Sequence, residues 1–149
     1  MSVLSAASGK SAWRGYEYYT QNKVISWRQI DKDIYEGAVA GSGEEPYHII
    51  LDVAHPARSK CDCPHAEGKR IVCKHKVAVY FAIFPEEVDN YLKLVKEAEE
   101  EEKARVAARY EEIESYVKTL SKTELRRELT ELLYELRYER WQNINCLLF

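Results

Sequence analysis

The spacing of apolar and polar residues predicts one helix and three strands in the first half of the chain. Residues 11–21 favour a short amphipathic helix, because Ser11 can cap it and aromatic residues recur every third position on one face. The segments Val24–Ile30, Asp33–Gly41 and Tyr47–Val53 are rich in β-branched and aromatic residues and are separated by polar turns. We therefore expect an antiparallel three-stranded sheet with one face that needs a cover.

A strongly apolar helical pattern between Lys74 and Phe84 would supply that cover. Pro85 then stands where one helix can end and another can begin, since proline is tolerated in the first turn of a helix and not in its interior. The chain is therefore expected to continue as a separate, all-helical part from residue 86.

The second half carries two apolar seams with the spacing of a coiled coil. No helix breaker occurs between Glu86 and Leu120, and Ser121–Glu124 matches a capping box that begins a new helix. Two seams joined by a capped turn predict an antiparallel helical hairpin. The seam residues step alternately by four and three, and they are Val106, Tyr110, Ile113, Val117 and Leu120 in the first helix and Leu125, Leu129, Leu132 and Leu136 in the second.

Two features of this helical part leave alternatives open. The acidic stretch Glu97–Glu102 occupies positions where the first seam would continue, so it is either a solvated helix face or a hinge. Further apolar residues lie outside the seams and would form a large exposed patch on a monomer. A homodimer through the C-terminal helices is one way to cover them.

Length and composition limit the class of protein. The chain has 149 residues, about one domain's length, and 46% hydrophobic with 32% charged residues is typical of a soluble globular protein. No apolar run approaches the roughly 18 residues of a membrane span, and the N-terminal residues lack the pattern of a secretion signal. We therefore expect a cytoplasmic protein.

The net charge of −3 hides an uneven distribution. Residues 1–85 contain 11 Lys and Arg against 9 Asp and Glu, whereas residues 86–149 contain 11 against 16. The segment that holds three of the four cysteines is locally basic. A basic patch of this kind can hold a phosphate backbone even on a mildly acidic protein.

Three cysteines and one histidine have the spacing of a metal site. Cys61 and Cys63 form C-x-C, and Cys73 and His75 form C-x-H after a loop of nine residues. Three thiolates and one imidazole make a closed tetrahedral set for a structural Zn²⁺ ion, which leaves no open position for catalysis. His65 in the loop is the alternative histidine ligand.

Two interpretations compete with a zinc site. The cysteines are ordinary buried residues, or two of them form a redox pair. The redox pair lacks C-x-x-C spacing and a βαβ context, and four potential ligands within fifteen residues favour a metal over chance burial.

The residues around this motif resemble a SWIM zinc-finger domain, whose signature is C-x-C, a variable loop and C-x-H. The resemblance covers about half the chain, from Arg14 to Phe84, and leaves residues 86–149 outside. It implies a small β-sheet, a metal that clamps the last strand to the following helix, and a role in binding DNA or protein partners. The residues that carry it are Arg14-Gly15, Tyr18-Tyr19, Lys23-Val24, Ala38-Val39, Gly41-Ser42, Tyr47–Leu51, Cys61-Asp62-Cys63-Pro64, Cys73-Lys74-His75 and Ala78-Val79.

Pattern, motif and resemblance together predict an α+β protein with two domains. Residues 10–85 would form a SWIM-like zinc-binding domain, with a three-stranded antiparallel sheet, a Cys3His site and a covering helix. Residues 86–149 would form the long helical hairpin.

The function expected from the sequence is binding, without enzymatic activity. A rigid zinc loop would present basic residues to DNA, where phosphate contacts supply affinity. The alternative is a protein-interaction adaptor in which zinc is only a scaffold and the C-terminal helices carry recognition. The predicted nucleic-acid contacts are Arg58, Lys60, Lys69, Arg70, Lys74 and Lys76.

Overall fold

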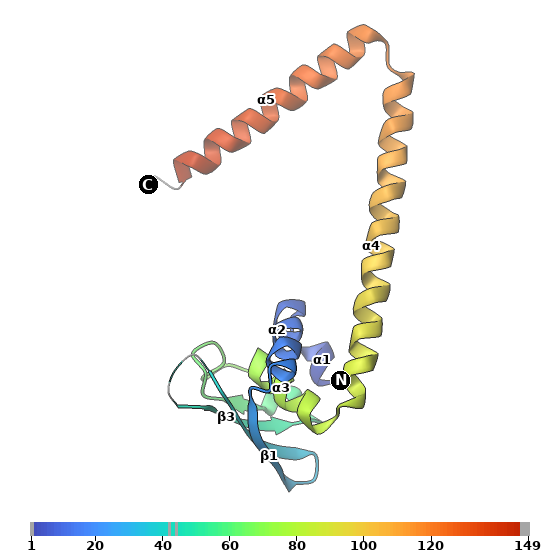
Figure 1. The fold of residues 1–149 in the computed structure, drawn as a ribbon. Helices are drawn as coiled ribbons and strands as arrows, with labels where there is room; N and C mark the ends of the chain where they lie inside the picture. Colours follow the sequence, from blue (N-terminus) through green and yellow to red (C-terminus); the bar gives the residue numbers. More distant parts are fainter. Residues whose placement is uncertain (1, 42, 44, 147–149) are drawn as a thin grey trace. The chain divides into compact units, whose positions relative to one another are not determined.

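The computed structural model describes residues 2–41, 43 and 45–146, with side chains described as far as Tyr138. It is an α+β protein whose N-terminal part holds a four-stranded antiparallel sheet and three helices, followed by two long helices (Figure 1). By its contacts the chain divides into two compact units, the first ending at Val95 and the second beginning at Lys96. This division lies inside a helix that starts at Glu86, just after the predicted boundary.

The sheet has the order β1-β2-β3-β4 and is antiparallel throughout. Its strands are β1 (Val24–Asp31), β2 (Ile34–Val39), β3 (Tyr47–Asp52) and β4 (Lys60–Cys61). The sequence predicted the first three and missed β4. Two residues give no alternating pattern, and only their pairing with Ile49 and Ile50 of β3 makes them a strand.

Two short elements were also missing from the sequence prediction. Helix α1 spans Val3–Ala6, and a 3₁₀ turn, η1, spans Pro56–Arg58 directly before β4. Both are too short for a periodic pattern to be visible in the sequence. Val3 is nevertheless fully buried, so α1 belongs to the core.

Helix α2 spans Gly9–Thr20 and begins two residues earlier than predicted. The cap is Ser8 and not Ser11, because the Ser8 Oγ atom accepts a hydrogen bond from the backbone N–H of Ser11 at 3.2 Å. Ser11 is therefore the third residue of the helix, and its prediction as the cap was wrong.

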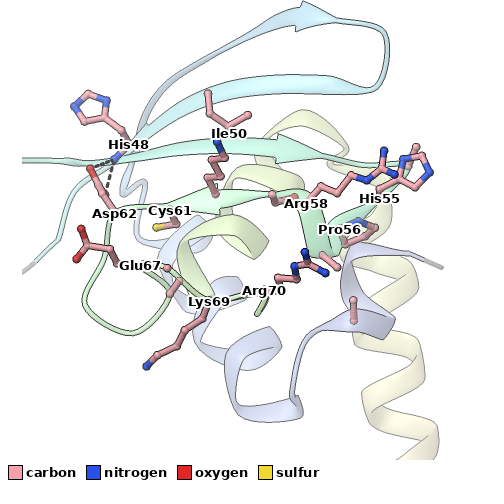
Figure 2. Close-up of a pocket in the computed structure, with 17 residues that line it drawn as sticks. His48, Ile50, His55, Pro56, Arg58, Cys61, Asp62, Glu67, Lys69 and Arg70 are labelled. Carbon is pink, nitrogen blue, oxygen red and sulfur yellow. Dashed lines mark hydrogen bonds between the residues drawn. The ribbon is translucent and has the colours of Figure 1, made fainter.

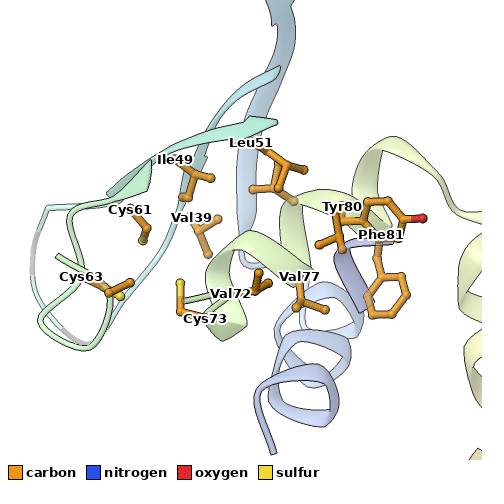
Figure 3. Packing of buried hydrophobic residues seen from close by; sticks show 13 residues of the cluster. Val39, Ile49, Leu51, Cys61, Cys63, Val72, Cys73, Val77, Tyr80 and Phe81 are labelled. Atoms are coloured by element: carbon orange, nitrogen blue, oxygen red, sulfur yellow. The ribbon is translucent and has the colours of Figure 1, made fainter. Parts of the chain in front are cut away.

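Helix α3 spans Lys74–Ile83 and lies between the sheet and α2. Residues from His75 to Phe81 are all buried, which explains why the helix is apolar on every side. Val79 faces Gly37 of β2, whereas Val77 faces Gly15 of α2. The core of the first unit therefore has the sheet, α3 and α2 as successive layers (Figure 3).

The two long helices are α4 (Glu86–Thr119) and α5 (Lys122–Cys146). The capping box predicted at their junction is present, since Ser121 and Glu124 exchange hydrogen bonds. Helix α4 is continuous through Glu97–Glu102, whose side chains are exposed, as a solvated helix face requires. None of the helices in the described part of the chain is long and apolar enough to cross a membrane.

The two seams of α4 and α5 are present as helix faces, but their side chains are not buried. Eight of the nine predicted seam residues are exposed, from 37% at Leu125 to 71% at Tyr110, and Leu120 is half-buried. The burial expected of a packed antiparallel hairpin is therefore not observed among the described side chains. Seam spacing shows that an apolar face exists, and it does not identify the surface that covers it.

We expect substitution of Gly15 to separate α2 from α3. A Cβ atom built there would lie 2.4 Å from Val77 Cβ and 3.0 Å from the backbone oxygen of Lys74, so the helices must move apart. Gly15→Ala should lower the free energy of unfolding by about 1–3 kcal/mol, the usual cost of overpacking. Urea denaturation of the metal-loaded protein measures this.

Gly9→Ala is the matched control, because Gly9 lies in the same helix and a Cβ atom there has nothing within 4 Å. It should leave stability unchanged or slightly higher. Equal effects of the two substitutions would mean that the close approach at Gly15 does not determine the packing.

Candidate metal centre

The structure brings the four predicted ligands together at one end of the core. Cys61 ends β4, Cys63 lies in the following loop, Cys73 caps α3 and His75 lies in the first turn of that helix. Their candidate ligand atoms all lie within 4.8 Å of one another. Figure 3 shows the three cysteines gathered beside the apolar core.

The local sequence explains why these four side chains converge. With one residue between them, Cys61 at the end of a strand and Cys63 in a turn can face one point. Cys73 and His75 do the same at a helix start. The loop of residues 64–72 reverses the chain between the pairs, and Gly68 in that loop has a φ of 68°, which L-residues rarely adopt.

The donor set fits a zinc ion. Two sulfurs bound to one tetrahedral zinc lie about 3.8 Å apart, so the observed spacing needs only small side-chain adjustments. All four residues are at most 5% exposed. The His75 Nε2 atom is buried and has no hydrogen-bond partner among the described residues. A buried imidazole without a full set of protein partners is typical of a metal ligand.

The three cysteine thiols differ in the direction of their pKa shifts. A hydrogen bond from the Cys61 thiol is the main cause that lowers the pKa of Cys73, to about 3, and the same bond raises the pKa of Cys61. Burial raises the pKa of Cys63. All three thiols must be deprotonated to bind Zn²⁺, so metal binding releases protons from this cluster.

A buried lysine ties the two ligand-bearing segments to each other. Lys76 is fully buried, and its Nζ atom donates hydrogen bonds to the backbone oxygens of Ser59 at 2.7 Å and Ile71 at 2.8 Å. Ser59 lies two residues before Cys61, and Ile71 lies two residues before Cys73. The ammonium group therefore holds in place the two segments that lead to Cys61 and to Cys73.

The same lysine balances charge. Burial lowers the pKa of Lys76, whereas negative charge on the three cysteines raises it. Three thiolates and one Zn²⁺ ion leave one net negative charge, which a buried cation nearby offsets. Lys76 was predicted to contact DNA, but its side chain is fully buried and is not accessible to a partner.

Two tyrosines cover His75. The ring of Tyr47 lies 4.5 Å from the imidazole, and the ring of Tyr18 lies 5.3 Å from it, edge-on. Tyr47 can lie there because Gly41 has no side chain, since a Cβ atom on Gly41 would come within 2.3 Å of the Tyr47 ring. The aromatic cover limits the access of water to the ligand set, which sequence spacing alone did not indicate.

The remaining predicted site residues are distributed over two surfaces. Lys74 donates a 2.6 Å hydrogen bond to the hydroxyl of Tyr18, so it also supports the cover of His75. His65, the alternative ligand, is exposed and lies outside the cluster. Four basic residues line a groove beside β4, and they are Arg58, Lys60, Lys69 and Arg70. Figure 2 labels Arg58, Lys69 and Arg70 among the residues that line it.

We expect the purified chain to carry one zinc ion, and Cys73→Ser to abolish stoichiometric binding because it removes one of the four ligands. Elemental analysis of reduced protein measures the occupancy. Cys146→Ser is the control, since Cys146 is outside the predicted ligand set, and it should keep its zinc. Full occupancy in Cys73→Ser would exclude the proposed ligand set.

Lys76→Met should destabilise the zinc-loaded protein by about 2–4 kcal/mol, because two buried carbonyl groups lose a charged donor. Thermal or urea unfolding measures the effect. Lys69→Met, at an exposed position, should change the stability little. If Lys76→Met is as stable as Lys69→Met, the lysine does not hold the two segments together.

Comparison with known proteins agrees with this geometry. Residues 41–84 match the family model of the SWIM zinc finger. This segment contains β3, β4, the whole ligand set and α3, and residues 1–40 and 85–149 lie outside it, so the predicted resemblance between Arg14 and Val39 is not part of the match. No curated protein and no solved structure matches the chain. Residues 41–84 therefore carry a SWIM zinc finger, and the Cys3His cluster within them fits a Zn²⁺ ion.

Proposed function

We propose that this protein is a non-enzymatic DNA-binding protein that holds the phosphate backbone in the groove beside its zinc site. One observation carries the proposal. Four of the six basic residues predicted from the sequence line a single groove, although they come from η1, β4 and the loop before α3. They are Arg58, Lys60, Lys69 and Arg70 (Figure 2).

The groove has the size and charge for part of a polyanion. Its volume is about 1030 Å³, which is at the upper end of the range for small-molecule sites and suits a segment of an extended polymer. All four basic side chains are exposed, so none needs to be desolvated before a phosphate approaches. Two acidic residues, Asp62 and Glu67, also line it, which leaves an excess of positive charge.

One of the two carboxylates is already engaged. Both oxygens of Asp62 accept a hydrogen bond from the backbone N–H of His48, at 3.0 and 3.1 Å. This contact fixes the residue between the two cysteine ligands to β3. Asp62 therefore supports the scaffold, and we assign recognition to the basic residues.

In the proposed function, the zinc ion keeps the backbone that carries the basic residues rigid. Lys60 directly precedes Cys61, and Lys69 and Arg70 belong to the loop that the metal closes. Side chains on a fixed backbone lose less conformational freedom on binding than those on a mobile loop. Metal removal should therefore weaken DNA binding even though no base or phosphate contacts the ion.

Replacing Arg58, Lys60, Lys69 and Arg70 with Gln should weaken binding to all DNA sequences alike, because phosphate contacts position a protein without reading bases. The log–log dependence of affinity on salt should become less steep, by up to about 3.6 on duplex DNA or about 2.8 on single strands. Titration of labelled single- and double-stranded DNA at several salt concentrations measures both.

The matched control replaces Lys32, Lys96, Lys103 and Lys122, exposed residues that do not line the groove, with Gln. It changes the net charge equally and should retain most of the affinity. If both variants bind alike, only overall charge matters and the groove is not the site. If the unsubstituted protein shows no salt-sensitive binding, the DNA proposal fails.

The second candidate function is that of a protein-interaction adaptor with zinc as its scaffold. The exposed apolar faces of α4 and α5 favour it, since such faces on a soluble protein mark interaction sites. Failure of DNA binding in the titration above would leave this function in place. For either function we propose a cytoplasmic protein, because three thiolate ligands are most stable in a reducing compartment.

A further inference from the structure

The apolar faces of α4 and α5 match each other residue by residue. Four of the five seam residues of α4 lie 4, 8, 11 and 15 positions before Ser121, and the four of α5 lie 4, 8, 11 and 15 positions after it. An antiparallel alignment centred on this residue therefore brings each of these eight apolar side chains opposite another. The four pairs are Val117 with Leu125, Ile113 with Leu129, Tyr110 with Leu132, and Val106 with Leu136.

Charged residues beside the seams match in the same alignment. Glu114 of α4 comes next to Arg126 of α5 on one side, and Arg109 of α4 comes next to Glu135 of α5 on the other. Both pairs combine opposite charges at the positions that flank the core of an antiparallel coiled coil. One register thus satisfies four apolar pairs and two ion pairs.

The structure shows this surface available. The eight apolar side chains are each at least 37% exposed. The connection between the helices is held by its own hydrogen bonds, from the Leu120 N–H to Val117 and within the capping box of Ser121 and Glu124. With this connection in place, the two helices of one chain leave each other's seams uncovered, and a second chain can cover them.

We propose that the partner of this surface is a second copy of the same chain. Helix α4 of each copy pairs with α5 of the other, in the register centred on Ser121. The exchange is symmetric, so two identical interfaces form and sixteen seam side chains are buried together. The dimer carries two zinc fingers, and partners with two binding sites are then bound with higher avidity. The inference does not depend on what the zinc finger binds.

Reversal of either charge in the Glu114–Arg126 pair tests the exchange. Glu114→Arg places two arginines opposite each other, and Arg126→Glu places two glutamates opposite each other. Each variant alone should dissociate to the 17.4 kDa monomer at concentrations where the unsubstituted full-length, zinc-loaded protein has twice that mass. An equimolar mixture of the two variants should recover the doubled mass, because each mutated side chain then meets its complement. Sedimentation or light scattering measures the mass.

The mixing experiment separates the other outcomes. If the helices close within one chain, the unsubstituted protein is monomeric and mixing changes nothing, which overturns the proposal. If α4 pairs with α4, the mixture does not recover. Glu111→Arg is the matched control, because Glu111 points away from the seam at coiled-coil spacing, and it should remain dimeric. Circular dichroism and zinc content should be equal in all variants.

Discussion

The fold of the first unit depends on one constraint, that two short segments must deliver four donor atoms to one cation. The strand β4 has two residues and the loop after it has no regular structure, so neither would be ordered by local preference. Residues 61–75 also bury few large apolar side chains, because Cys, Ala and Val line this end of the core. Metal binding supplies the folding free energy that such a segment lacks. The three cysteine ligands accordingly belong to the same buried cluster as the apolar core.

The buried side chain of Lys76 also depends on the metal site. A fully buried ammonium group is costly unless it is paired, and here it has two carbonyl partners and an anionic cluster nearby. The lysine, the thiolates and the metal therefore stabilise one another, and removal of any of them leaves the others buried without compensation. The exposed cations that line the groove play no part in this balance. Lysines of one short segment therefore differ, since Lys76 belongs to the buried scaffold whereas Lys60 and Lys69 are exposed.

The sequence was sufficient for the fold class and the grouping of the ligands, because both leave local signals. Alternating strands, capped helices and the C-x-C and C-x-H pairs are read from neighbouring residues. The errors concern properties set by distant contacts. Lys76 looks like Lys69 in the sequence, and only the packing of α3 between two layers makes it a buried residue. The strand β4 and the cover of His75 by Tyr47 likewise require knowledge of the sheet.

In the helical half, the sequence pattern predicts which residues pair but not which chain each helix belongs to. Its seams specify a register strongly, since apolar and charged positions agree on one centre, yet a register does not say whether the two helices belong to one chain. Stability cannot decide this from one chain, because closing within a chain and exchanging between chains bury the same pairs. The structure bears on this choice through exposure, because the eight seam side chains of one chain are not covered by each other. The proposed exchange covers them without requiring the connection at Leu120 and Ser121 to bring the two helices of one chain together.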